Sequence, residues 1–138
     1  MNRTRHRVIY ADTDAGQVVY YANYFRFFET GRREIFRQLG IDFKKLMDAG
    51  IIAPVVESHC NYFAPAVYDD LLGIETYITE LKDKTIRFEY VIRNESGKMI
   101  VSGYTVNVFA DSGLMKSISI PKEVKSAVKV DEKPNTAR

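Results

Sequence analysis

The chain has 138 residues, of which 46% are hydrophobic and 28% are charged. This length suits one domain, and the composition is typical of a globular protein rather than a disordered, collagen-like or repeat-built one. The net charge is +2, but residues 1–120 carry 15 basic and 15 acidic side chains, so the excess lies in residues 121–138. Because residues 1–120 carry no net positive charge, nucleic acid is disfavoured as a partner.

The counts of cysteine and histidine and the lengths of the apolar runs exclude further classes of protein. The chain has one cysteine, Cys60, and two histidines, His6 and His59, so we expect no internal disulfide, and zinc and iron–sulfur chemistry are poorly supported. No apolar run approaches the roughly 18 to 20 residues that span a bilayer, and the N-terminus lacks an apolar stretch before a cleavage site. We therefore expect a cytoplasmic protein without a membrane span.

A strand, a turn and a long helix are predicted first. Residues 5–10 favour a short strand, and the small and acidic residues 11–16 favour a turn. Residues 23–39 contain no proline and predict a helix, with Asn23 as its N-cap and Gly40 after its end.

This helix is amphipathic, because its apolar residues cover about half of the helical wheel. Gly31 lies near the middle of that arc, where glycine costs helix propensity. We therefore expect the helix to approach another backbone closely there, as a sheet wrapped around it would do. A shorter helix is expected over residues 43–49, starting at Ile41 or Asp42 and ending at Gly50.

Beyond residue 50 the hydrophobic pattern changes to a period of two, which is typical of strands. The turns between the later strands are short, so these neighbours must be antiparallel. The order of elements predicts an α+β domain with an antiparallel meander after the helices. The expected strands are residues 55–63, 71–81, 85–93, 98–109 and 114–120.

The C-terminal end is expected to add little to the core. Residues 121–130 permit one or two helical turns after Pro121, and residues 131–138 offer nothing to bury. We predict one domain over residues 1–130 and a flexible tail over residues 131–138.

Two aspartates, Asp12 and Asp14, stand between the first strand and the aromatic start of the long helix. They form either a solvated turn beside a helix N-terminus or a base or nucleophile next to N–H groups that bind a developing oxyanion. Along an extended segment the two side chains would share one side. Asp12 is better explained as a turn or helix-capping carboxylate than as a catalyst.

Three segments carry a recognisable pattern. They are Tyr10-Ala11-Asp12-Thr13-Asp14-Ala15-Gly16-Gln17-Val18-Val19-Tyr20-Tyr21-Ala22-Asn23-Tyr24 with Phe27-Phe28-Glu29 and Arg32, then Asn61-Tyr62-Phe63-Ala64-Pro65-Ala66-Val67-Tyr68-Asp69-Asp70, and Ile120-Pro121. Together they resemble hot-dog-fold acyl-CoA thioesterases of the 4-hydroxybenzoyl-CoA thioesterase type, over about residues 5–128. The resemblance implies the hot-dog fold, a curled antiparallel sheet wrapped around one long central helix, in agreement with the predicted elements.

The resemblance implies hydrolysis of an acyl-CoA thioester, without metal or tightly bound cofactor, with Asp14 as the catalytic carboxylate, either as nucleophile or as the base that activates water. It further implies that N–H groups at the helix start, around Tyr21, polarise the thioester carbonyl. The substrate-binding residues that it implies are Gly16, Tyr21, Asn23 and Glu29.

The acyl group and the carrier stay open. Many aliphatic-acyl members have histidine in place of Tyr21 and glycine in place of Gln17, whereas tyrosine also occurs in the aryl-acyl branch. Glu29 falls near the acyl pocket of that branch and is equally explained as a solvated helix residue. Acyl carrier protein is an alternative carrier to CoA. Related chains pair their sheet edges and build the active site between subunits, so the resemblance implies a homodimer or homotetramer.

Several other residues have structural explanations, and two alternative functions stay open. Arg32 indicates a buried ion pair or a subunit contact, His59 a surface or interface histidine, and Cys60 a packed thiol. The alternative functions are a non-catalytic acyl-CoA or acyl-carrier binding module, and a cone-shaped α+β isomerase, which needs several helices before the sheet. The basic residues that can hold CoA phosphates are Lys84, Arg87, Arg93, Lys98 and Lys116.

Overall fold

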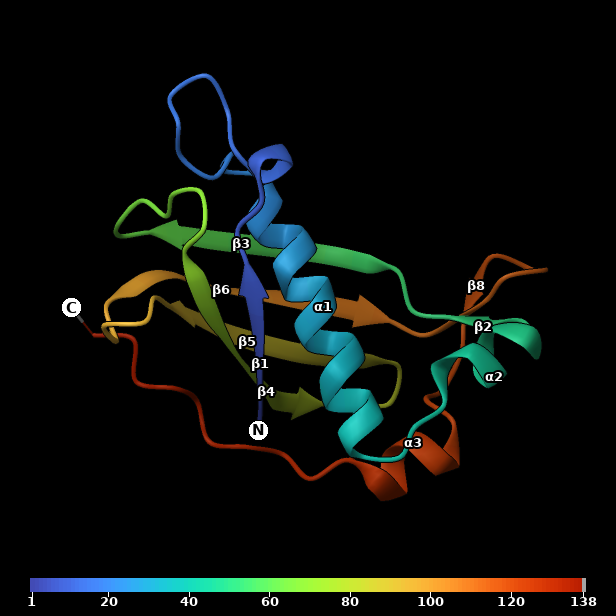
Figure 1. Ribbon diagram of the computed structural model, residues 1–138. Coiled ribbons are helices and arrows are strands. Elements are labelled where there is room, and N and C mark those ends of the chain that lie inside the picture. The colour runs from blue at the N-terminus through green and yellow to red at the C-terminus, as the bar shows by residue number, and fades with distance from the viewer. Residues whose placement is uncertain (138) are drawn as a thin grey trace.

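One long helix lies across a curved sheet in the computed structural model, which describes residues 1–137 (Figure 1). The elements in chain order are β1 (Asn2–Arg7), the 3₁₀ turn η1 (Tyr10–Asp12), α1 (Asn23–Gln38), α2 (Phe43–Asp48), β2 (Ile51–Ile52), β3 (Val55–Tyr62), β4 (Leu71–Leu81), β5 (Thr85–Arg93), β6 (Met99–Val108), β7 (Ala110–Asp111), β8 (Lys116–Ser117) and α3 (Lys122–Ala127).

The main sheet has five antiparallel strands in the order β1-β4-β5-β6-β3. The short turns join β4 to β5 and β5 to β6, as predicted. The expected meander is wrong for β3, which pairs with β6 at one edge instead of with β4. The connection after β3 crosses the end of the sheet, because Ala64 donates its N–H to Ile100 and Asp69 donates its N–H to Val8, beyond β1.

Two predicted strands have different limits in the structure. The first ends at Arg7, because the Asp12 carboxylate accepts the N–H of Ile9 at 2.9 Å and the chain turns into η1. The last expected strand, residues 114–120, is reduced to β8 in a small sheet of order β2-β7-β8. Met115 just before it has a φ of 52°, which an extended strand does not allow.

Helix α1 packs its apolar face on the sheet and approaches β4 most closely at Gly31. A Cβ on Gly31 would collide with Oγ1 of Thr76 and would lie 3.3 Å from Cγ2 of Ile74. The predicted close approach is therefore confirmed, and glycine is required because any side chain would push the helix off the sheet.

The ends of the helices follow the sequence with one exception. Gly40 comes after α1 with a φ of 74°, and Asp42 caps α2 by accepting the N–H of Lys45 at 3.1 Å. The prediction of Asn23 as the N-cap of α1 is wrong, because Ala22 takes that position and Asn23 is the first helical residue. The Asn23 amide instead donates to the carbonyl of Asp12 at 2.8 Å.

Strand β3 is an open edge of the main sheet, paired on one side only. Along it only Cys60 is partly buried, and Val56 leaves 61% of its surface exposed. An unpaired edge with exposed apolar side chains is a surface on which another strand can be added.

The chain after α3 runs back across the molecule toward the N-terminus (Figure 1). Asp131 pairs with β4 there, since its N–H donates to the carbonyl of Ile78 at 2.7 Å and its carboxylate accepts the Ile78 N–H at 2.9 Å. The same carboxylate contacts the N-terminal ammonium of Met1 at 3.0 Å. The tail over residues 131–138 stays a prediction, and Arg138 lies outside the described residues.

Candidate active site

The segment between η1 and α1 is a tight loop that carries Asp14. Thr13 and Val19 form a bridge across its base, and the N–H of Asp14 donates to the carbonyl of Val18 at 3.0 Å. At the tip, Oδ1 of Asp14 accepts the N–H of Gly16 at 2.8 Å. The other carboxylate oxygen, Oδ2, accepts no hydrogen bond from residues 1–137. Asp14 thus presents one fixed and one unengaged oxygen on the surface.

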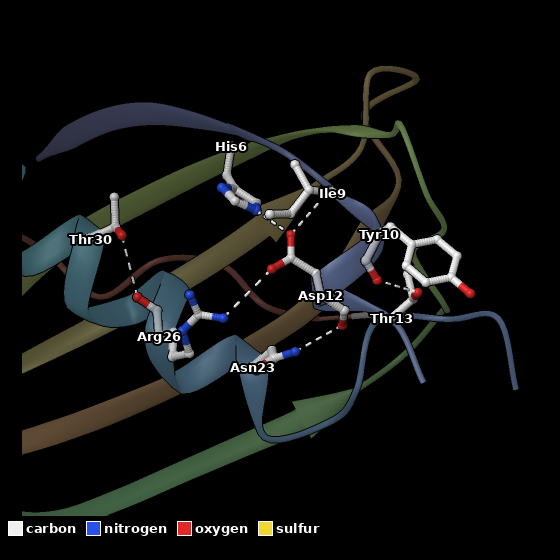
Figure 2. A network of polar contacts seen from close by, with 8 residues as sticks. All are labelled: His6, Ile9, Tyr10, Asp12, Thr13, Asn23, Arg26 and Thr30. Carbon is white, nitrogen blue, oxygen red and sulfur yellow. Dashed lines mark hydrogen bonds and ion pairs between the residues drawn. The ribbon is translucent and has the colours of Figure 1, made fainter. Parts of the chain in front are cut away.

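Asp12 has the opposite environment, being 1% exposed. Its Oδ2 lies 2.7 Å from Nε2 of His6 and accepts the N–H of Ile9. Its Oδ1 lies 3.6 Å from Nη1 of Arg26. Figure 2 shows His6 from β1 and Arg26 from α1 converging on this carboxylate. The two aspartates therefore do not share one side of an extended segment, because η1 turns Asp12 inward.

The carbonyl of Asp12 anchors the far end of the loop. It accepts the N–H of Tyr20 at 2.9 Å. It also accepts the side-chain amide of Asn23 at 2.8 Å, as Figure 2 shows. The expectation that Asp12 is a turn carboxylate is confirmed, and its side chain and carbonyl together hold both ends of the loop that presents Asp14.

The backbone just before α1 offers unengaged donors. Within the described part of the chain, the N–H groups of Tyr21 and Ala22 donate no hydrogen bond. Such groups at a helix start carry partial positive charge and favour a nearby anion. The pKa of Tyr20 is raised mainly by the neighbouring Tyr21 hydroxyl and, to a smaller extent, by desolvation and by the negative charge of Asp14.

Aromatic rings surround this backbone. Tyr21 is 61% exposed, and its ring centroid lies 4.7 Å from that of Tyr20 and 6.5 Å from that of Tyr62 on β3. The Tyr62 hydroxyl donates to the carbonyl of Tyr21 at 3.0 Å. Burial raises the pKa of Tyr24 to about 12 and that of Cys60 to about 11. Both groups are therefore neutral at pH 7, and the Cys60 thiol is a poor nucleophile, as expected.

A cavity of about 1040 Å³ lies between α1, α2, the segment before β3 and the sheet. Glu29 lines this cavity, whereas Asp14, Gly16, Tyr21 and Asn23 do not. Glu29 is six residues beyond Asn23, which is about 9 Å along a helix axis. The structure thus places Asp14 and Gly16 together on the loop before α1, whereas Glu29 lines the cavity.

The remaining candidates are placed as follows. His59 is exposed, and its Nε2 lies 3.0 Å from Oδ1 of Asn61. Arg87 pairs with Glu89 at 3.4 Å and Arg93 with Glu75 at 3.6 Å. The other expected phosphate-binding residues have no ion pair among residues 1–137; they are Lys84, Lys98 and Lys116.

Two contacts escaped sequence reasoning. His6 lies on β1 beside the aspartate loop, and only its position six residues before Asp12 hinted at their pairing. Arg32 was expected to form an ion pair or a subunit contact, yet no carboxylate of the described chain lies within 4 Å of it. Instead its Nη1 donates to the hydroxyl of Tyr90 at 3.1 Å and to Oγ1 of Thr105 at 3.5 Å.

Across residues 1–137, no three His, Cys, Asp or Glu side chains are grouped so that they can hold a metal ion. No helix in this part of the chain is long and apolar enough to cross a membrane.

Comparison with known proteins identifies the family. The family model described as "Thioesterase-like superfamily" matches residues 8–128. The acyl-CoA thioesterase YbgC of Haemophilus influenzae is 42% identical over 123 residues, which cover 88% of this chain and 89% of the relative.

Solved structures agree with this assignment. A hypothetical protein from Aquifex aeolicus superimposes with a TM-score of 0.87 at 32% identity, covering 94% of this chain and 100% of that one. A gentisyl-coenzyme A thioesterase superimposes with a TM-score of 0.82 at 32% identity, covering 91% and 98%. The chain therefore belongs to the thioesterase-like superfamily, and the hot-dog fold expected from its sequence is confirmed.

Proposed function

We propose that this thioester hydrolase acts on acyl-CoA and uses Asp14 as its catalytic carboxylate. The Haemophilus influenzae relative, an acyl-CoA thioesterase that is 42% identical, supports the substrate. The observation that carries the role of Asp14 is its exposed carboxylate, which has one oxygen held by the Gly16 N–H and one unengaged, on a loop that leads into the helix start.

Two routes use this carboxylate. As a base, Asp14 takes a proton from water while the water oxygen attacks the thioester carbon. The carbon–sulfur bond then breaks, and the proton passes to the departing CoA thiolate, which yields the free acid and CoA. As a nucleophile, Asp14 attacks the carbon itself, CoA leaves as the thiolate, and water hydrolyses the resulting anhydride and regenerates Asp14. The two routes stay open.

Both routes place negative charge on the former carbonyl oxygen. The N–H groups of Tyr21 and Ala22 are the donors that we assign to this oxygen, because they precede α1 and have no acceptor among the described residues. Fixed donors at the position of a developing charge stabilise the transition state more than the ground state.

The other expected substrate residues receive distinct roles. A Cβ on Gly16 would come within 3.1 Å of Oδ1 of Asp14. A larger residue at this position would therefore crowd the carboxylate, which glycine does not do. Asn23 acts through the Asp12 carbonyl to hold the helix start in place. The exposed ring of Tyr21 covers the reacting carbonyl, and Glu29 contacts the acyl group in the cavity.

A second subunit completes the site in this proposal. Glu29 and Asp14 lie on different surfaces of one chain, and the cavity reaches Val55 on the open edge of β3. Addition of a partner's strand to that edge would cover the cavity wall, which favours a homodimer or a pair of homodimers. Cytoplasmic location and acyl carrier protein as an alternative carrier stay predictions.

The test is release of free thiol from a panel of aryl-CoA and short to long aliphatic acyl-CoA substrates, with wild-type protein and Asp14→Asn. Turnover that depends on Asp14 supports the proposal. A folded wild-type protein that binds acyl-CoA and releases no thiol would instead be the non-catalytic binding module.

A further inference from the structure

The cavity beside α1 is lined by apolar, polar and charged residues. Phe36, Ile86 and Phe88 are buried apolar residues that line it. Its volume of about 1040 Å³ is at the upper end of the range for small-molecule sites. In a cavity of this kind, the few polar groups determine which ligand is accepted.

Arg32 is a cation of this cavity that has no carboxylate partner among residues 1–137. The other cations that line it, Arg33, Arg37 and Lys44, each lie within 4 Å of a carboxylate. Arg32 has no such partner within residues 1–137, although it is half-buried. A half-buried guanidinium without a counter-charge is unfavourable, so a group that neutralises it would gain binding energy.

The guanidinium of Arg32 is held firmly but has donors to spare. Nη1 donates to Tyr90 and Thr105, whose oxygens lie 2.6 Å from each other. The Nη2 and Nε groups have no acceptor in the described chain. Arginine has five N–H donors in a planar fork that matches a carboxylate, so the unused donors form a preset anion site.

A second polar group in the same cavity lacks a partner. The side-chain amide of Asn107 donates from Nδ2 to the carbonyl of Ala53 at 2.7 Å, whereas its Oδ1 is buried and accepts no hydrogen bond. Asn107 lines the cavity together with Arg32. An unsatisfied buried acceptor is costly, and a ligand or a water bound beside it would remove that cost.

We propose that this cavity takes the acyl group of the thioester and that Arg32 binds a carboxylate at the far end of that group. The substrate class is then an acyl-CoA whose acyl chain carries a second, terminal carboxylate. This inference rests on the proposed function. The apolar residues of the cavity suit the methylene chain. The positive charge of Arg32 can pair with a terminal carboxylate but not with a neutral acyl end.

The test compares adipoyl-CoA with hexanoyl-CoA, because both have a six-carbon acyl chain and differ in the terminal carboxylate. We expect wild-type protein to show the higher kcat/KM with adipoyl-CoA. Arg32→Gln should lower kcat/KM with adipoyl-CoA by roughly 10- to 100-fold and change that with hexanoyl-CoA by less than about 3-fold. Arg32→Lys should recover part of the loss, because it restores the charge without the fork.

Arg5→Gln is the control, since Arg5 is an exposed arginine that does not line the cavity. It should leave both substrates within about 3-fold of wild type. An equal loss of kcat/KM with both substrates in Arg32→Gln would overturn the assignment and give Arg32 a structural role. Weaker inhibition of Arg32→Gln by desulfo-CoA would overturn it and place Arg32 on a CoA phosphate. Dissociation of an oligomer by Arg32→Gln would likewise overturn it in favour of a subunit contact.

Failure of the proposed function gives a different result. If wild-type protein hydrolyses neither thioester, calorimetric titration with adipate still tests the site. Adipate binding that is lost in Arg32→Gln and kept in Arg5→Gln supports the carboxylate site. Absence of adipate binding, or equal binding of adipate to Arg32→Gln, overturns it.

Discussion

Nε2 of His6 lies 2.7 Å from Oδ2 of Asp12, and this contact ties β1 to the segment that carries Asp14. The same carboxylate accepts the N–H of Ile9 and lies 3.6 Å from Arg26 on α1. One buried side chain therefore joins β1, η1 and the long helix two residues before the proposed catalytic carboxylate.

Replacement of Asp12 should weaken the fold. Asp12→Ala leaves the Ile9 N–H and the His6 imidazole without their acceptor in a buried place, so we expect a loss of about 3 kcal/mol in the free energy of unfolding. Arg26→Ala is the control, because the Arg26 side chain is exposed and its contact is long; it should cost less than about 1 kcal/mol. Urea unfolding measures both, and equal losses would contradict a central role of Asp12.

The close approach of α1 to β4 can be tested at two positions. Gly31→Ala places a Cβ against Oγ1 of Thr76, and we expect it to lower stability by about 1 to 3 kcal/mol despite the better helix propensity of alanine. Thr76 Oγ1 is buried and has no hydrogen-bond partner in the described chain, so removal of this hydroxyl should cost little in the free energy of unfolding. Gly31→Ala combined with Thr76→Ala should recover most of the lost melting temperature, and failure to do so would contradict this contact.

Local patterns predicted those parts of the fold that depend on neighbours in the chain. The apolar face of residues 23–38 and the alternation in residues 85–93 each identify one element, and short turns leave one pairing for β4, β5 and β6. The place of β3 was beyond such reasoning, because the segment after it bonds to Ile100 on β6 and to Val8 just after β1, which are contacts between residues far apart in the sequence.

The site was predictable to a similar extent. The motif around Asp14 is contiguous in sequence and was identified, whereas the inward turn of Asp12 depends on His6, a contact between two elements. Arg32 illustrates the same limit. Its position on the apolar arc indicated burial, but only the folded chain shows that no carboxylate lies beside it within the described residues.

The hydrogen bonds of Asp131 indicate that the dispensable tail begins after this residue rather than at it. Asp131 forms two hydrogen bonds with Ile78, so deletion of residues 131–138 removes them, whereas deletion of residues 132–138 keeps them. We expect the longer deletion to cost about 1 to 3 kcal/mol and the shorter one to leave the melting temperature nearly unchanged. Thermal unfolding of the two truncated proteins decides this, and equal melting temperatures would show that Asp131 contributes nothing.

The Cys60 thiol should be unreactive in the folded protein. Burial raises its pKa to about 11, so almost none of it is the thiolate at pH 8. Alkylation by iodoacetamide at pH 8 should be at least about 10-fold slower than in the same protein unfolded in urea. Cys60→Ser should keep the wild-type kcat, since the proposed mechanism does not use the thiol. Rapid alkylation of the folded protein would contradict the effect of burial.

The decisive variant for the mechanism is Asp14→Asn. Asparagine retains an oxygen that accepts the Gly16 N–H, so the loop should keep its shape while the negative charge is lost. We expect kcat to fall by roughly 10²- to 10⁴-fold with little change in KM, because a base or nucleophile acts mainly in the transition state. Thiol release under saturating acyl-CoA measures this effect.

Asp111 offers a matched control on the same chain. Its Oδ1 accepts the N–H of Gly113 at 2.8 Å, which repeats the turn that Asp14 forms with Gly16 in a place remote from α1 in the sequence. Asp111→Asn should therefore alter the same local bond and keep the wild-type kcat. If Asp14→Asn, folded and in the same oligomeric state, also kept it, the Asp14 carboxylate would be a turn residue and the catalytic group would have to be sought elsewhere.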